Sequence, residues 1–243
     1  MFSVSCKNCS SKLSFRLTKW LRIIPFVKSN LLNSSASIGS FRNTVINFPS
    51  IFVFEKLGCK VHDLYCELDG DFPNHHPDPS RPENLKDLID LVVGSNLDIG
   101  LAFDGDADRL GVISPLGEII YPDMQMIIFS ESILNSSPNS KIVFDVKCSN
   151  LLSESITKKN GIPIMCKTGH TFIKEAIRNE SALLGGEMSG HIFFNDRYYG
   201  YDDGINSAIQ VCHLLNNQNK KISEIINELP KTFQSPTMAP YCK

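Results

Sequence analysis

Long apolar runs are missing from this sequence of 243 residues. A helix that spans a membrane needs about 20 consecutive apolar residues, so we expect no membrane partner. Charge of one sign is not in excess either, because 24 basic and 26 acidic residues leave a net charge of −2. Such a balance gives no reason to expect a nucleic acid as a partner. With 42% hydrophobic and 21% charged residues, the composition is that of a soluble globular protein.

The eight cysteines do not follow a disulfide or zinc pattern. They are scattered, and no secretory hydrophobic segment precedes them, so we expect reduced thiols and a cytoplasmic location. Cys6 and Cys9 form one Cys-x-x-Cys pair. A zinc site would need a second pair or histidines at a suitable spacing, so we expect none here.

Acidic residues are absent from 1–50, which contain seven basic residues and eleven serines. Every acidic residue lies from Glu55 onward. An acid-free, basic and serine-rich start is typical of an organelle transit peptide, but a divergent extension or a misread gene start would have the same composition. We therefore predict no fold for 1–50.

The most informative stretch runs from Phe103 to Arg109 and reads Phe-Asp-Gly-Asp-Ala-Asp-Arg. It places three carboxylates, Asp104, Asp106 and Asp108, at alternate positions after a short apolar strand. In an extended chain, residues two apart are roughly 6.5 Å apart, too far for all three to reach one ion, so the backbone must curl, as Gly105 permits. Oxygen ligands suit a small hard cation, and Mg²⁺ is the usual ion where a phosphate shares the site.

The run has three other possible interpretations. An EF-hand that starts at Asp104 needs Gly at its sixth and Glu at its twelfth position, but these are Arg109 and Pro115, which excludes a calcium hand. A phosphatase of the haloacid-dehalogenase type also has an Asp-x-Asp pair after a strand, as Asp104 and Asp106 provide, but its next polar position is normally Thr or Val, not Asp108. A surface turn is the third, because Asp and Gly favour turns for local reasons.

Arg109 favours the metal loop over these alternatives. A guanidinium beside bound metal is suited to hold an anion such as phosphate. The remaining alternative is that Arg109 only neutralises its acidic neighbours.

From Phe54 onward, apolar segments of strand and helix character alternate. In a first unit we expect strands over Cys59–Tyr65, Leu97–Phe103 and Leu110–Ser114, and a helix over Asn84–Val93. In a second unit we expect strands over Glu118–Tyr121, Lys141–Val146, Ile162–Cys166 and Ala182–Gly185, and helices over Asp123–Leu134, Ser149–Lys159 and Thr171–Asn179. Such alternation predicts the α/β class.

Polar residues follow the strands of the second unit, where open α/β sheets bind their ligands. These candidates are Lys147, Lys167, His170, Glu187, Ser189 and His191. The lysines suit a phosphate or a sugar oxygen, although solvated lysines are as common. Glu187 and Ser189 suit two adjacent sugar hydroxyls. The histidines suit proton transfer near neutral pH, and a structural hydrogen-bonding role is the alternative.

Three motifs occur in a fixed order: Asp104–Arg109, Lys167–His170 and Gly186–His191. With the runs 72–79, 144–148 and 201–204, they resemble the α-D-phosphohexomutase family, of the bacterial phosphomannomutase/phosphoglucomutase type, from about Phe54 to about Leu215. The resemblance implies two consecutive mixed-sheet α/β domains. Their expected bounds are 51–116 for a partial second domain and 117–230 for the third, after the unassigned 1–50 and before 231–243, a truncated linker to a missing domain.

Members of that family transfer phosphate between the 1 and 6 positions of a hexose phosphate through a phosphoserine. The resemblance implies that the three aspartates hold Mg²⁺ against the phosphoserine and that Arg109 orients it. It also implies that mannose or glucose phosphate is the substrate, and that Glu187 and Ser189 bind its hydroxyls. Further implied substrate-binding residues are Lys147, Lys167, His170 and His191, and the implied catalytic residues are Arg109, Lys147 and His170.

The sequence departs from the family pattern at three places. It has no loop like Thr-Ala-Ser-His-Asn-Pro for the phosphoserine and none like Arg-x-Ser-Gly-Thr for the substrate phosphate, and Met124 stands where many members have a basic residue. We therefore expect an incomplete or split mutase with little activity alone, whose missing domains would come from a complementary polypeptide. The alternatives are a non-catalytic fragment that binds metal and sugar phosphate and, less favoured, a dehalogenase-type phosphatase.

Overall fold

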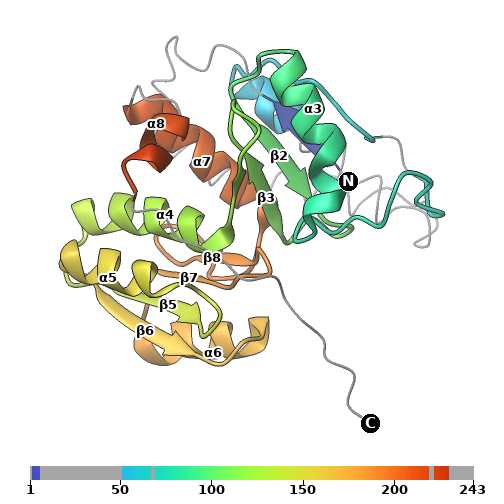
Figure 1. Cartoon of the computed structure of the whole chain (residues 1–243). Coiled ribbons are helices and arrows are strands. Elements are labelled where there is room, and N and C mark those ends of the chain that lie inside the picture. Colours follow the sequence, from blue (N-terminus) through green and yellow to red (C-terminus); the bar gives the residue numbers. More distant parts are fainter. Residues whose placement is uncertain (1, 6–50, 67–68, 219–221, 230–243) are drawn as a thin grey trace.

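The computed structural model describes residues 2–5, 51–66, 69–218 and 222–229, which form two sheets with their helices (Figure 1). The predictions for 6–50, including the Cys6–Cys9 pair, and for 231–243 lie outside the described residues. None of the helices described here combines the length and the apolar character needed to cross a bilayer.

The first sheet is antiparallel, with the strand order β1-β2-β3-β4. Its strands are β1 (Phe2–Ser5), β2 (Gly100–Phe103), β3 (Leu110–Ile113) and β4 (Ile119–Ile120). The 3₁₀ turn η2 (Pro82–Leu85) and helix α3 (Lys86–Gly94) cover one face, where Leu88 and Val92 pack against Ala102 and Ile113. Because Phe103 of β2 pairs with Leu110 of β3, the aspartate-rich run becomes the loop of a hairpin.

The second sheet is mixed, with the order β6-β5-β7-β8. Its strands are β5 (Lys141–Asp145), β6 (Ile162–Cys166), β7 (Leu184–Gly186) and β8 (Ile192–Phe194), and only β8 runs antiparallel to its neighbour. Helices α4 (Pro122–Ser136) and α5 (Asn150–Lys158) cover one face and α6 (His170–Glu180) covers the other (Figure 1). Because β5, β6 and β7 are parallel, the loops after them meet at one edge of the sheet.

Side chains alternate between the two helical layers of this second sheet. Ile142 and Phe144 of β5 belong to the core that contains Leu152 of α5. Val143, between them, belongs to the core that contains Ile173 of α6. This period of two is that of a β-strand buried on both faces.

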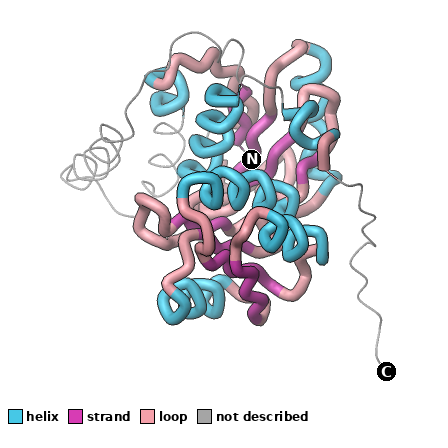
Figure 2. The backbone as a smooth tube through the Cα atoms, turned by 90° about the vertical axis from the view of Figure 1, so that its left-hand side faces the viewer, coloured by secondary structure: helices cyan, strands magenta, loops and turns pink. Residues whose placement is uncertain are grey.

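Helix α7 (Gly204–Gln218), followed by α8 (Ile222–Asn227), connects the two halves. Ala208 and Val211 of α7 share one core with Phe103 of the first sheet and with Phe129 of α4 and Phe194 of the second sheet. Figure 2 shows the two groups of strands as separate sheets, one above the other in that view. The common core holds the loops of the two sheets at a fixed separation.

The α/β class is confirmed, and helices α3 to α6 lie where they were expected, but two strand predictions need correction. The segment Cys59–Tyr65 is not a strand, and only Leu64 makes an isolated bridge. One reason is that the free edge of β2, opposite β3, pairs with β1 and not with this segment. Another is that Tyr65 has a φ of 56°, which an extended strand does not allow. β1 belongs to the segment for which the sequence predicted no fold, and β8, α7 and α8 were not predicted.

The strand expected over Glu118–Tyr121 is shorter than predicted and belongs to the first sheet. Only β4 is extended, and it pairs with β3 of the first sheet rather than opening the second unit. The cause is a tight turn. The Ser114 hydroxyl accepts hydrogen bonds from the backbone N–H of Leu116 and of Glu118, both at 3.2 Å, and Gly117 has a φ of 82°, so the chain folds straight back onto β3.

Candidate functional site

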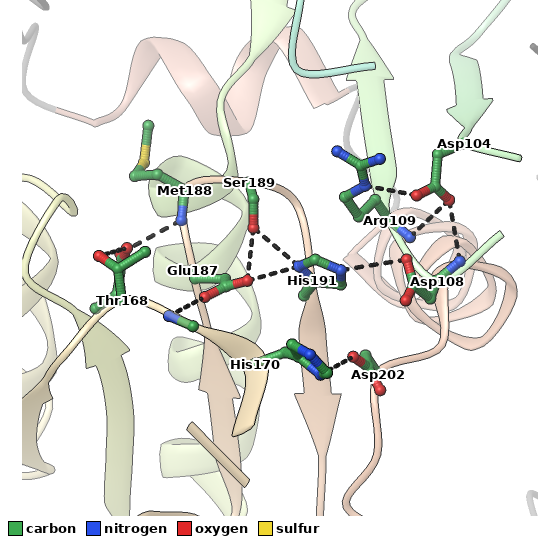
Figure 3. A network of polar contacts seen from close by, with 12 residues as sticks. Asp104, Asp108, Arg109, Thr168, His170, Glu187, Met188, Ser189, His191 and Asp202 are labelled. Carbon is green, nitrogen blue, oxygen red and sulfur yellow. Dashed lines mark hydrogen bonds and ion pairs between the residues drawn. The ribbon is translucent and has the colours of Figure 1, made fainter. Parts of the chain in front are cut away.

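The loop between β2 and β3 is curled by its first aspartate (Figure 3). Asp104 is buried, and its Oδ1 accepts the backbone N–H of Asp108 at 3.1 Å and of Arg109 at 3.2 Å. Ala107 adopts a left-handed conformation with a φ of 58°. As a result, one carboxylate oxygen from each of Asp104, Asp106 and Asp108 lies within 4.8 Å of the others.

This donor set fits a small divalent cation such as Mg²⁺. All three groups are carboxylates, whose oxygen atoms are the hard ligands that Mg²⁺ prefers, and the buried Oδ1 of Asp108 also lies 3.2 Å from His191 Nε2. Asp106 is exposed, so the open side of the loop leaves room for water or phosphate ligands. Mg²⁺ normally keeps such ligands beside one or two protein carboxylates.

Arg109 is held by carboxylates on both sides. Its Nε donates to Asp104 Oδ2, and its Nη1 donates to Asp78 Oδ1 at 3.3 Å. Burial raises the pKa of Asp104 to about 6, although the hydrogen bonds from Arg109 act in the opposite direction. Burial would also raise the pKa of Asp78, but hydrogen bonds from Ser80 and the charge of Arg109 hold it below its usual value. Sequence reasoning did not single out Asp78.

The loop between β7 and β8 is built around a second buried carboxylate, Glu187. Its Oε2 accepts the Gly169 N–H at 3.0 Å, and its Oε1 accepts the Ser189 hydroxyl at 2.7 Å and lies 2.6 Å from His191 Nδ1. Burial would raise the pKa of Glu187, but the hydrogen bonds from His191, Ser189 and Gly169 lower it to about 2. Glu187 is therefore ionised at neutral pH.

His191 joins the two loops. Its Nε2 lies 3.2 Å from Asp108 Oδ1, while its Nδ1 faces Glu187 (Figure 3). Burial would lower the pKa of His191, but the two carboxylates raise it to about 9. The backbones also pair, since Arg109 and His191 form an antiparallel bridge and Leu110 N–H donates to Gly190 O at 3.2 Å. The cation loop and the Glu187 loop thus form one unit.

Asp145, at the end of β5, holds three loops together. It is fully buried, and it accepts the Thr168 hydroxyl at 2.9 Å, the Met188 N–H at 3.3 Å and the Cys148 thiol at 3.2 Å. Sequence reasoning gave Asp145 no role. The sequence signal for Asp145 was its position as an acidic residue at the end of an otherwise apolar strand.

His170 begins α6 and flanks the network. Its side chain is 57% exposed, its Nδ1 lies 3.7 Å from Asp202 Oδ2, and its ring stacks on that of His191 with 5.9 Å between the centroids. Lys174 Nζ lies 2.7 Å from Asp202 Oδ1. Neither Lys174 nor Asp202 was predicted as a site residue, although Asp202 lies in the run 201–204 that contributes to the family resemblance.

The two predicted lysines stay at the margin of the site. Lys147 and Lys167 are exposed in the loops after β5 and β6. Lys167 Nζ lies 5.7 Å from the centroid of the Phe172 ring. The contacts of the described residues do not connect either lysine to Glu187, His191 or Asp108. The arrangement as a whole offers a cation loop with a guanidinium and a hydrogen-bonded carboxylate–hydroxyl pair, and His191 contacts both the loop and the pair.

Comparisons with known proteins agree with this geometry. Residues 48–117 match the family model described as phosphoglucomutase/phosphomannomutase, alpha/beta/alpha domain II, and residues 121–233 match the model for domain III. A phosphoglucomutase of Neisseria gonorrhoeae is 48% identical over 186 residues, which are 76% of this chain and 40% of the relative. A phosphomannomutase/phosphoglucomutase of Pseudomonas aeruginosa is 48% identical over 184 residues, with the same two shares.

A solved structure shares the fold. The phosphoglucomutase/phosphomannomutase family protein of Burkholderia thailandensis superposes with a TM-score of 0.76 at 44% identity, over 79% of this chain and 42% of that protein. The chain spans 40% of the length of the two curated relatives above.

Proposed function

Because the chain belongs to the phosphoglucomutase/phosphomannomutase family of α-D-phosphohexomutases, we propose that it provides the metal-binding and sugar-binding loops of a phosphohexomutase. The reaction would be the Mg²⁺-dependent transfer of phosphate between the 1 and 6 positions of a hexose phosphate through a phosphoserine. The observation that best supports this proposal is the backbone bridge between Arg109 and His191, since it joins the cation loop to the Glu187 loop.

Asp104, Asp106 and Asp108 would hold the Mg²⁺. When bound, this ion would neutralise charge on the phosphoryl oxygens during transfer. Arg109, in the same loop, would orient the phosphate. Its guanidinium would then contact the phosphate in addition to Asp104 and Asp78, with which it already forms ion pairs.

The sugar would lie against the loops after β5, β6 and β7. Glu187 and Ser189 would bind two hydroxyls, and the low pKa of Glu187 keeps its carboxylate an acceptor. His191 would also contact the substrate, beside Glu187 and Ser189. The exposed side chains of Lys147, Lys167 and His170 would approach the substrate from the margin, and His170 would move a proton to or from a sugar hydroxyl. In this proposal residues 51–116 carry the metal loop and residues 117–230 carry the sugar loops.

Calorimetric titration with mannose 6-phosphate and glucose 6-phosphate, in Mg²⁺, tests the proposal. The chain should bind at least one of them, and Glu187→Gln should weaken binding about tenfold or more, because the ionised acceptor is lost. Glu175 is an exposed carboxylate on α6, so Glu175→Gln is the matched control and should leave the affinity unchanged. Binding that is absent, or equal in the two variants, would contradict the proposal.

Turnover separates the mutase from the other functions. Conversion of mannose 1-phosphate to the 6-phosphate should be slight for the chain alone and should rise when the phosphoserine-bearing domain of a relative is added. A non-catalytic fragment would show no rise. A dehalogenase-type phosphatase would instead hydrolyse an aryl phosphate and lose that activity in Asp104→Asn.

A further inference from the structure

The segment 76–84 lies against the cation loop, and its Asp78 reaches Arg109. Asp78 Oδ1 accepts a hydrogen bond from Arg109 Nη1 at 3.3 Å, across 31 positions of the sequence. Both side chains are partly buried, with 18% of Asp78 and 25% of Arg109 exposed. The neighbouring Pro77 packs on the same loop, because its Cγ lies 3.6 Å from the position that a Cβ on Gly105 would take. Asp78 therefore contacts the cation loop from outside it.

Asp78 is itself held in place by its neighbours. Ser80 donates to Asp78 Oδ1 from its backbone N–H at 3.1 Å and from its hydroxyl at 2.7 Å. Asn84 Nδ2 donates to the carbonyl oxygens of His76 at 3.0 Å and of Asp78 at 2.9 Å, which fixes the backbone around the carboxylate. Arg81 Nε lies 3.5 Å from Asp78 Oδ2, but its side chain is 65% exposed, so this ion pair contributes little. The carboxylate is thus preorganised, as a group that holds a functional side chain must be.

Arg109 uses different nitrogens for its two carboxylate partners. Its Nε donates to Asp104 Oδ2, and its Nη1 donates to Asp78 Oδ1. A single contact would leave the guanidinium free to turn about that contact, whereas two contacts at different nitrogens fix its plane. The hydrogen bonds within the described residues leave the Nη2 donors of Arg109 available to an anion.

The two carboxylates differ in what a bound cation would do to them. Asp104 is one of the three aspartates that could hold the ion, so the cation would compete with Arg109 for its oxygens. Among the described residues, Asp78 belongs to no group of side chains that could hold an ion, so its contact with the guanidinium would persist. Building on the function proposed above, we infer that Asp78 is a positioning residue, which keeps the plane of the Arg109 guanidinium fixed so that Nη2 can donate to a phosphate at the cation loop.

Nuclear magnetic resonance of the Arg109 Nε–H group in the whole chain, with saturating Mg²⁺ and increasing inorganic phosphate, tests this role. The signal is identified by its loss in Arg109→Lys. In the wild type, rotation about the Nε–Cζ bond should be slow, and phosphate should shift the signal. Asp78→Ala should speed the rotation several-fold and weaken phosphate affinity about tenfold, because the guanidinium loses its fixed plane. Asp78→Asn keeps an acceptor oxygen for Arg109, so it should restore slow rotation and most of the affinity.

Glu83→Ala is the matched control, because Glu83 lies in the same segment and pairs with Arg81 Nη1 at 3.5 Å rather than with Arg109. It removes the same charge and should leave the rotation and the phosphate affinity unchanged. Circular dichroism and thermal unfolding establish that each variant is folded, and Mg²⁺ affinity reports the state of the cation loop.

Two results would overturn the positioning role of Asp78. One is a rotation that stays slow in Asp78→Ala, and the other is a loss of phosphate affinity that the loss of Mg²⁺ affinity matches, since a merely structural role would lower both together. If phosphate did not shift the wild-type signal, the phosphate-binding role proposed for Arg109 would be wrong. The rotation would still show whether Asp78 fixes the guanidinium, so the two failures are distinguishable.

Discussion

Asp108 and His191 belong to loops of different sheets, yet His191 Nε2 lies 3.2 Å from Asp108 Oδ1. This contact, with the hydrogen bond from His191 Nδ1 to Glu187, makes the imidazole a link between the cation loop and the sugar-binding loop. In the metal-free protein the imidazole of His191 is protonated at neutral pH, because the two carboxylates raise the pKa of His191 to about 9.

The stability of the metal-free chain should depend on the protonation of His191. Its pKa in the folded state lies above the ordinary value of 6.5, so its contribution is fully present below about pH 6.5 and is lost as the pH rises through 9. Denaturant unfolding in chelator should show a loss of about 2 kcal/mol between about pH 7 and pH 10. His191→Gln should remove this part of the pH dependence. If the unfolding free energies of the wild type and of His191→Gln changed with pH in parallel, His191 would not be protonated in the folded protein as proposed.

Mg²⁺ binding should weaken in acid because of Asp104. Burial raises the pKa of this carboxyl to about 6, so it holds a proton below that pH and the cation must displace it. Calorimetry should show an affinity that falls about tenfold for each pH unit below 6. Asp106→Asn should lower the affinity at every pH but keep the slope, because Asp106 is exposed. An affinity that stays constant down to about pH 5 would argue against Asp104 as a ligand.

Gly204→Ala should disturb the cation loop from outside it. A Cβ on Gly204 would lie 2.8 Å from the carbonyl oxygens of Ala107 and Arg109, closer than van der Waals contact allows. Because Gly204 N–H also donates to Ala107 O at 3.0 Å, the start of α7 and the loop must move together. We expect Mg²⁺ affinity to fall several-fold.

The matched control for this prediction is Gly161→Ala, whose Cβ would lie 2.6 Å from Leu134 Cδ1, in the core of the second sheet. It should lower the melting temperature without changing Mg²⁺ affinity. If both variants lose affinity in proportion to their loss of stability, Gly204 has no specific effect on the loop.

Asp145→Ala should loosen the loops that follow β5, β6 and β7. The substitution leaves the Thr168 hydroxyl and the Met188 N–H without their acceptor in a buried place, so we expect a loss of about 2–3 kcal/mol in unfolding free energy. Hexose-phosphate affinity should fall as well, because Met188 and Glu187 are neighbours. Thr168→Val removes one of these hydrogen bonds and should have a smaller effect on both measurements. Equal effects of the two variants would contradict the role of Asp145 as the common anchor.

The sequence was most informative where contacts are local. The spacing of Asp104, Asp106 and Asp108 predicted a curled loop after a strand, and the curl depends on hydrogen bonds to residues four and five positions away. Helices α3 to α6 follow the apolar periodicity and were predicted to within about two residues of their observed ends. The strand expected over Cys59–Tyr65 failed because its place at the sheet edge is decided by a distant partner, β1.

Neighbouring residues carry the periodicity and the motifs, so the α/β class, the family and the kinds of side chain in each loop could be inferred from the sequence. Which loops meet depends on the tertiary structure. The pairing of Asp108 with His191, the anchoring of three loops by Asp145 and the marginal position of Lys147 and Lys167 depend on how two sheets pack around α7. Burial and opposing charge shift the pKa values of Asp104, Glu187 and His191, and neither exists until that packing has formed.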